Sequence, residues 1–265
     1  MDAPTFEHLL ITCDSRRATL TLNRADSLNS LTNEVMAEII AAADWFDHQP
    51  DLRVVVVEGA GRAFCAGFNV NEFRADMPQS PAGGRIPADT GRLMADALER
   101  MAPVLIARLH GHVVGGGLVL AAACDLRVAA DDVNFFIPEV DLGIPLAWGG
   151  IPRLVREIGP ALTKELVMTC RPFDAAEAKA AGFVNRVVPI ANLDSAVEDL
   201  AEEVASRPRL AVLATKAHVN AVTSQMVGTG RAWSDGDGLG VALRDPEARA
   251  AQADYLEKMQ SARRS

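Results

Sequence analysis

Two glycine-rich turns in this 265-residue chain could place backbone N–H groups around one small ligand. The first, residues 61–68 (Gly-Arg-Ala-Phe-Cys-Ala-Gly-Phe), follows the apolar run 54–57, and the second is the triplet Gly115-Gly116-Gly117. A buried strand that breaks into Ala and Gly exposes N–H groups at its end, and a helix that opens with Gly exposes more at its positive dipole end. Two such groups that converge would form an oxyanion hole.

The hydrophobic pattern before the first turn predicts a hairpin, a helix and a buried strand. Residues 9–12 and 18–22 have the composition of strands, and the polar residues between them supply the turn. Thr32 can cap a helix whose apolar residues share one face and which ends near Pro50. The β-branched run 54–58 does not alternate with polar residues, which is typical of a strand buried on both faces.

The pattern around the second turn predicts further strands and helices. Residues 76–89 are rich in Pro and Gly, which indicates a loop that could act as a lid over the first turn. A helix is expected at about 91–101 and a buried strand at 104–109. The strand leads into a helix over 115–123 that is apolar on every side and must lie inside the protein. Such alternation, as far as residue 188, predicts an α/β protein.

The end of the chain is expected to be helical. Residues 192–206 and 210–224 have helical spacing, and the Gly- and Asp-rich stretch 228–240 breaks the helix before it. We therefore divide the chain into a core with the ligand sites, residues 1–190, and a C-terminal helical region, residues 191–265.

Composition excludes several classes of function. The chain is 49% hydrophobic and 23% charged, as expected of a globular protein with one large core. Its net charge of −9 argues against nucleic-acid binding, which depends on clustered Lys and Arg. The four cysteines form neither a CxxC pair nor a metal-ligand spacing, so we expect free thiols in a reducing cytoplasm. The sequence shows no signal peptide and no run long enough to span a bilayer, so no membrane contact is expected.

Several short motifs, in a fixed order, resemble those of one family. They are Leu-Asn-Arg at 22–24, Ser-Leu-Asn-Ser-Leu at 27–31, Phe-Cys-Ala-Gly at 64–67, Gly-x-x-x-Gly-Gly-Gly at 111–117, Ala-Cys-Asp at 123–125, Pro-Glu-Val-Asp-Leu-Gly at 138–143, Ala-Ala-Glu-Ala at 175–178, Gly-Phe-Val at 182–184 and Val-Val-Pro at 187–189. The chain thus resembles the crotonase, or enoyl-CoA hydratase/isomerase, superfamily. The resemblance implies a crotonase-like spiral of ββα and βαβ turns whose C-terminal helical region assembles homo-oligomers, as trimers or dimers of trimers.

The resemblance also implies roles for individual residues. It places two oxyanion donors on the backbone N–H groups of Phe68 and Gly116, and the acid-base group on Glu139. The apolar residues before Glu139 would desolvate its carboxyl and raise its pKa towards a range useful for proton transfer. Contacts with an acyl-CoA thioester are implied for Arg24, Ser27, Leu28, Ala66, Gly67, Asn69, Val70, Gly115, Pro138 and Leu142. No metal or separate cofactor is implied, since coenzyme A enters as part of the substrate.

Two residues depart from the family pattern. Many hydratases carry a second Glu where this chain has Val119, which cannot hold an attacking water. Dienoyl-CoA isomerases and aryl-CoA dehalogenases carry an Asp where this chain has Ala147. One carboxylate suffices to move a proton from C2 to C4 of a 3-enoyl thioester, so 3-enoyl to 2-enoyl isomerisation is favoured. Hydration stays open, because hydroxycinnamoyl-CoA hydratase-lyases also use a single Glu at this position.

Two other functional classes remain. A pseudoenzyme that only binds acyl-CoA would also explain Val119 and Ala147. An unrelated nucleotide-binding protein is disfavoured, because the Gly triplet lacks the Lys-Ser/Thr of a P-loop. We expect His110 and His112 to be hydrogen-bonded core residues, and Lys216 to lie on a solvated helix face rather than near the nucleotide. If Glu139 were dispensable, the next candidates for the base would be Glu72, Asp141 and Asp235.

Overall fold

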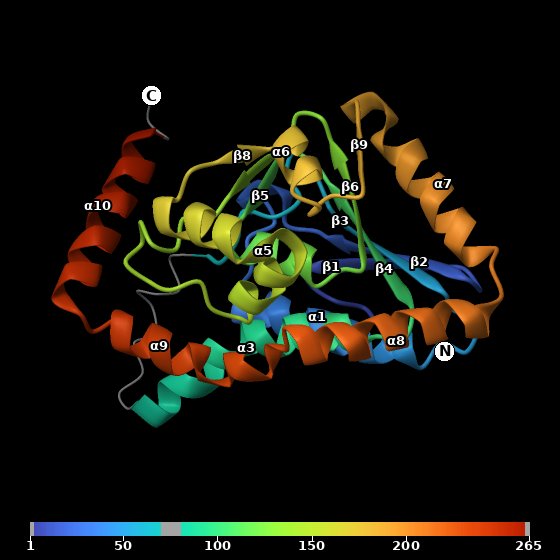
Figure 1. Ribbon diagram of the computed structural model, residues 1–265, viewed down its shortest axis with the longest axis horizontal. Helices are drawn as coiled ribbons and strands as arrows, with labels where there is room; N and C mark the ends of the chain where they lie inside the picture. The colour runs from blue at the N-terminus through green and yellow to red at the C-terminus, as the bar shows by residue number, and fades with distance from the viewer. Residues whose placement is uncertain (1–2, 70–80, 263–265) are drawn as a thin grey trace.

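The computed structural model describes residues 3–69 and 81–262 of the chain, without the side chains of 81–86, 259, 260 and 262. Its main feature is a six-stranded sheet with the strand order β1-β2-β3-β4-β6-β9 (Figure 1). The strands are β1 (Leu9–Cys13), β2 (Arg17–Leu22), β3 (Val54–Gly59), β4 (Val104–Leu109), β6 (Leu126–Ala130) and β9 (Arg186–Val188). The β1/β2 hairpin is antiparallel and every other pairing in this sheet is parallel.

A smaller sheet lies beside the first. It has the order β5-β7-β8, formed by β5 (His112–Val114), β7 (Asn134–Phe136) and β8 (Phe173–Asp174). The pair β5/β7 is parallel and the pair β7/β8 is antiparallel. A single bridge between Cys65 and Val113 joins β5 to the first glycine-rich turn. The small sheet therefore connects the two turns that the sequence singles out.

Helices cover both faces of the large sheet (Figure 1). They are α1 (Asn33–Asp47), α3 (Pro81–Arg100), α4 (Gly116–Ala122), α5 (Gly150–Thr169), α6 (Ala175–Ala180), α7 (Leu193–Ala205), α8 (Arg209–Met226), α9 (Asp235–Ala242) and α10 (Pro246–Ala262), with short 3-10 turns η1 (Ala25–Ser27), η2 (Ile190–Asn192) and η3 (Thr229–Ser234). None of the helices within residues 3–69 and 81–262 is both long and apolar enough to cross a bilayer.

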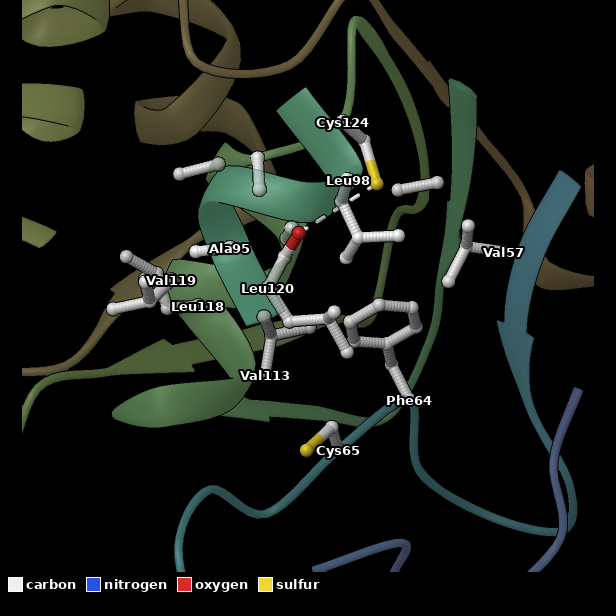
Figure 2. Packing of buried hydrophobic residues seen from close by; sticks show 14 of the residues in the cluster. Val57, Phe64, Cys65, Ala95, Leu98, Val113, Leu118, Val119, Leu120 and Cys124 are labelled. Atoms are coloured by element: carbon white, nitrogen blue, oxygen red, sulfur yellow. Dashed lines mark hydrogen bonds between the residues drawn. The ribbon is translucent and has the colours of Figure 1, made fainter. Parts of the chain in front are cut away.

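The strand β3 separates two hydrophobic cores, as its uninterrupted β-branched sequence predicts. Val55 and Val57 belong to the main core with α1, α3 and α4, whereas Val54 and Val56 pack towards α7. Every residue of α4 is buried, which confirms the prediction of an internal helix. Figure 2 shows α4 within this core, with Val119 on the side of the helix away from Phe64 and Val57.

The structure confirms the predicted hairpin, with each strand one residue longer than expected, and the predicted cap of α1. The Thr32 hydroxyl accepts a hydrogen bond from the Val35 N–H at 3.2 Å and so caps α1. The break expected after residue 224 occurs at the end of α8, although part of the Gly- and Asp-rich stretch then forms η3 and α9.

The loop predicted over 76–89 is wrong for residues 81–89, which form the first half of α3. Residues 76–80 lie outside the described part of the chain, and the lid stays a prediction. Pro81 occupies the first position of the helix, where its missing N–H has no partner to lose, whereas Pro87 lies inside the helix, a position where proline is disfavoured. The second half of α3 buries Met94, Ala95 and Leu98 in the main core, so tertiary packing outweighs the local Gly and Pro content.

Candidate active site

The first glycine-rich turn is held between strand β5 and the loop after β2. On one side, the Phe64 N–H donates to His110 O at 2.9 Å and the Cys65 N–H donates to His112 O at 3.1 Å. On the other side, Leu31 donates to Gly67 O and accepts from the Asn69 N–H, both at 2.8 Å. Since the N–H groups of successive extended residues point to opposite sides, the Phe68 N–H points away from Leu31.

The second turn begins α4 directly beside the first. Gly115 has φ of 49°, and its N–H donates to Phe136 O at 2.8 Å. Gly67 has φ of 85°, and a Cβ built on it would lie 2.6 Å from Val114 O and 3.3 Å from Gly116 N. Only glycine fits both the conformation and this close approach. The structure thus brings Phe68 and Gly116 onto adjoining turns.

Glu139 lies against this pair of turns. It follows Pro138 at the end of β7, and its carboxyl is packed on Gly115, where an added Cβ would lie 2.6 Å from Oε1. Its Oε2 is buried and has no hydrogen-bond partner among the described residues. Burial raises the pKa of Glu139 to about 7, as expected from its apolar approach. A carboxyl with this pKa can accept and return a proton near neutral pH.

The residues at the two departures from the family pattern are buried. Val119 is 1% exposed and Ala147 is 8% exposed. Val119 packs close to Gly150, where a Cβ would lie 2.9 Å from its Cγ2. Among the described residues, aliphatic groups therefore fill both places where related enzymes carry a second acidic side chain.

Three of the ten residues with implied coenzyme A contacts lie in the loop that contains η1. Arg24 and Leu28 flank η1, and Ser27 is its last residue. The Ala66 N–H donates to Leu28 O at 2.9 Å, which attaches this loop to the first turn. The Arg24 guanidinium donates to Ser30 O at 2.7 Å and so braces the loop. Leu142 packs with Ile144 and Leu239 in a small separate cluster. Pro138 is buried beside Glu139, Asn69 is half-buried after Phe68, and Val70 lies outside the described residues.

Asn29 is a residue whose role the sequence reading missed. It is 1% exposed, and its amide nitrogen donates to Ala60 O and Ala63 O, both at 2.8 Å. Its amide oxygen accepts from the Arg24 N–H at 2.9 Å. Asn29 therefore ties the η1 loop to the start of the first turn. Its φ of 56° is a conformation that Asn tolerates better than most residues, but the sequence alone gives no sign of these partners.

Two expectations for charged or titratable residues need correction. Lys216 is buried rather than solvated, because α8 lies against β4; it pairs with Asp125 at 2.7 Å and donates to Pro103 O at 2.7 Å. His110 is a hydrogen-bonded core residue, as expected, between Arg108 and Gly61 O, and burial lowers its pKa. His112 is exposed, so the same expectation is wrong for it.

The alternative bases differ in their surroundings. Asp141 is exposed, and Asp235 accepts a hydrogen bond from the Gly149 N–H at 2.8 Å. Glu72 lies outside the described residues. Of the two that are described, neither shares the close packing of Glu139 on Gly115.

The fold is that of the crotonase class of α/β proteins. The structure superposes on a solved enoyl-CoA hydratase/isomerase from Xanthobacter autotrophicus Py2 with a TM-score of 0.86 and 25% identity, covering 97% of this chain and 94% of that one. The sequence profile of the enoyl-CoA hydratase/isomerase family matches residues 15–262. The chain therefore belongs to the enoyl-CoA hydratase/isomerase family.

Relatives within the family differ in the activity that their names give. The chain is 39% identical over 190 residues to the probable enoyl-CoA hydratase echA8 of Mycobacterium tuberculosis, over 71% of this chain and 72% of that protein. It is 35% identical over 223 residues to a peroxisomal Delta(3,5)-Delta(2,4)-dienoyl-CoA isomerase of Arabidopsis thaliana, over 80% of each. The protein is thus an enzyme of this family, a lyase or an isomerase, for which the family implies an acyl-CoA substrate.

Proposed function

We propose that this enzyme converts 3-enoyl-CoA thioesters to 2-enoyl-CoA thioesters, with Glu139 as the only proton carrier. The observation that carries the proposal is the position of the Glu139 carboxyl. It is packed on Gly115 beside the Phe68 and Gly116 turns, and its pKa is raised to about 7. The aliphatic Val119 and Ala147 favour chemistry with one acid-base group over chemistry with two.

In the proposed reaction, the Glu139 carboxylate removes a proton from C2. The electrons of the broken C–H bond move towards the thioester oxygen, and the N–H groups of Phe68 and Gly116 stabilise the resulting dienolate. A single well-placed donor of this kind contributes roughly 3–4 kcal/mol in other enzymes. The same carboxyl then returns the proton to C4, which leaves the double bond between C2 and C3. No metal or redox cofactor is proposed, because every electron pair stays in the substrate.

The rate is expected to depend on pH through Glu139. Its carboxylate form does the work, so kcat/KM should rise about tenfold per pH unit below pH 7 and level off above it. Folding raises the pKa of Glu139, so its protonated carboxyl favours the folded state at pH values below the pKa of the unfolded chain. This contribution to the free energy of unfolding is lost as the pH rises through about 7. Isomerisation of 3-hexenoyl-CoA measured from pH 5 to 9 tests the rate, and a flat or falling profile would contradict it.

Hydration of 2-enoyl-CoA is the second candidate, favoured by the names of relatives such as the Mycobacterium protein. If the missing carboxylate at position 119 limits hydration, a substitution there should change the hydration rate. Val119→Glu is expected to raise hydration above the wild-type level, since it restores a carboxylate that could orient water. The change should also cost several kcal/mol of stability, because it buries a charge at a position that is 1% exposed.

Val119→Gln, of equal size without the charge, is the matched control for this experiment. Its melting temperature and hydration rate separate the effect of bulk from that of the carboxylate. A wild-type enzyme that already hydrates short 2-enoyl-CoA at on the order of 10 per second would contradict the proposal of a single acid-base group.

We also propose that the enzyme works as a trimer or a dimer of trimers in the cytoplasm. The helix α8 exposes apolar side chains that a subunit contact would cover, with Leu210 81% and Met226 75% exposed. The four cysteines are free, as suits a reducing compartment. Light scattering coupled to gel filtration measures the subunit number directly, and a monomeric mass would contradict the proposed assembly.

A further inference from the structure

Trp148 has an unusual backbone conformation for its residue type. Its φ is 61°, in the left-handed region that bulky side chains rarely occupy, and its side chain is buried. A residue stays in such a conformation only where its surroundings fix it, and residues of this kind cluster at functional sites. The contacts of the Trp148 ring and backbone must therefore hold this conformation in place.

The ring of Trp148 contacts both residues that are proposed to hold the thioester oxygen. A Cβ built on Gly116 would lie 2.4 Å from Cζ3 of Trp148, so the ring lies directly on the start of α4. The ring also stands edge-on to Phe68, with 5.7 Å between ring centroids and an interplanar angle of 87°. On a third side it rests on α3, where a Cβ on Gly91 would lie 2.1 Å from Cδ2.

A buried arginine and a half-buried aspartate fix the backbone of the turn that carries this ring. Nη1 of Arg153 donates to Trp148 O at 3.1 Å and to Gly149 O at 3.3 Å. The Asp235 carboxylate accepts from the Gly149 N–H at 2.8 Å. Arg153 is itself completely buried, and its Nη2 is held by Asp96 at 2.9 Å and Glu99 at 2.6 Å. The turn that carries Trp148 is thus tied to α3, α5 and α9.

We propose that Trp148 is a positioning residue that sets the separation of the two oxyanion donors by packing on both of them. The inference rests on the proposed function, because it assigns Trp148 an effect on the same pair of N–H groups. Such donors stabilise a developing charge only when they are held in place before the reaction. A misplacement of about 1 Å can cost about 10²-fold in rate.

The test uses a substitution that moves the ring without removing it. Gly91→Ala places a methyl group 2.1 Å from Cδ2 of the ring, so the ring must shift, and alanine favours the helix α3 more than glycine does. Gly240→Ala is the matched control, because it makes the same change in α9, where the nearest atom to the added Cβ is Arg244 Nη1 at 3.7 Å. Trp148→Phe and Trp148→Ala complete the series.

The readouts are kcat and KM for 3-hexenoyl-CoA and the absorbance of bound cinnamoyl-CoA, whose band moves to longer wavelength when its carbonyl is polarised. Gly91→Ala and Trp148→Ala are expected to lower kcat about 10²-fold, with KM within about threefold and the red shift of cinnamoyl-CoA largely lost. Trp148→Phe is expected to retain part of both signals, and Gly240→Ala all of them.

The results for the variants test the role of Trp148, and the result for the wild type tests the proposed function. If folded Gly91→Ala and Trp148→Phe keep wild-type kcat and the full red shift, Trp148 does not position the donors, even if Trp148→Ala fails to fold. A uniform loss of thioester binding without a change in the red shift per bound molecule would also overturn the inference, since it indicates a structural role only. If the wild type neither turns over 3-enoyl-CoA nor shifts cinnamoyl-CoA, the proposed function itself fails.

Discussion

Glu139→Gln is expected to lower kcat for 3-enoyl-CoA by about 10²- to 10⁴-fold, because the amide keeps the shape of the side chain but cannot accept a proton. The dissociation constant for an acyl-CoA should stay within about tenfold of the wild-type value. At pH values above 7, the variant should have a higher melting temperature than the wild type. The wild-type enzyme must ionise a buried carboxyl whose pKa is about 7, and the variant need not. Single-turnover kinetics, calorimetry and thermal melts measure the three quantities.

Glu257→Gln is a suitable control, because Glu257 is exposed on α10 and the substitution makes the same chemical change. It should alter none of the three quantities. Retained activity in Glu139→Gln would move the base to another residue, and Asp141, Asp235 and Glu72 would be tested next.

Phe68→Pro is expected to reduce kcat by about 10²- to 10³-fold more than Phe68→Ala, because only proline removes the backbone N–H. Proline at this position leaves the neighbouring bridge intact, since Leu31 bonds to Gly67 O and the Asn69 N–H rather than to Phe68. Both variants lose the aromatic contact with Trp148, so the difference between them reports the loss of the N–H together with the constraint that proline places on φ. Steady-state kinetics with circular dichroism as a check on folding measure that difference.

An equal loss of activity in the two folded variants would show that the side chain of Phe68, and not its amide, supports the reaction. The spectral shift of bound cinnamoyl-CoA gives a second reading of the same donor. It should survive in part in Phe68→Ala and disappear in Phe68→Pro.

Local patterns predict the elements whose structure depends on their own sequence. The run 54–57 reads as a strand buried on two faces because each of its residues is apolar, and the structure divides those residues between two cores. The cap at Thr32 is likewise a local interaction. The start of α3 could not be predicted, since its Gly and Pro content favours a loop and the contacts that favour a helix come from distant parts of the chain.

In the candidate site, too, local sequence predicts some features, whereas contacts between distant segments determine others. The residues near Glu139 predict a desolvated carboxyl, because the apolar approach is contiguous with it in sequence. The ring of Trp148 packs on Gly91 and Gly116, which lie in segments far from it in the chain. No spacing of residues in the sequence predicts this contact. The burial of Lys216 against Asp125 similarly depends on where α8 docks, which helical periodicity does not specify.

The most direct test of the proposed chemistry is the fate of 3-hexenoyl-CoA with the purified wild-type enzyme, followed by mass and by absorbance of the conjugated thioester. The proposal predicts 2-hexenoyl-CoA of unchanged mass, formed at between about 1 and 10³ per second, and formed about 10²- to 10⁴-fold more slowly with Glu139→Gln. Unaltered 3-hexenoyl-CoA, or a product one water heavier formed without the conjugated isomer, would contradict the assignment of Glu139 as a proton carrier between C2 and C4.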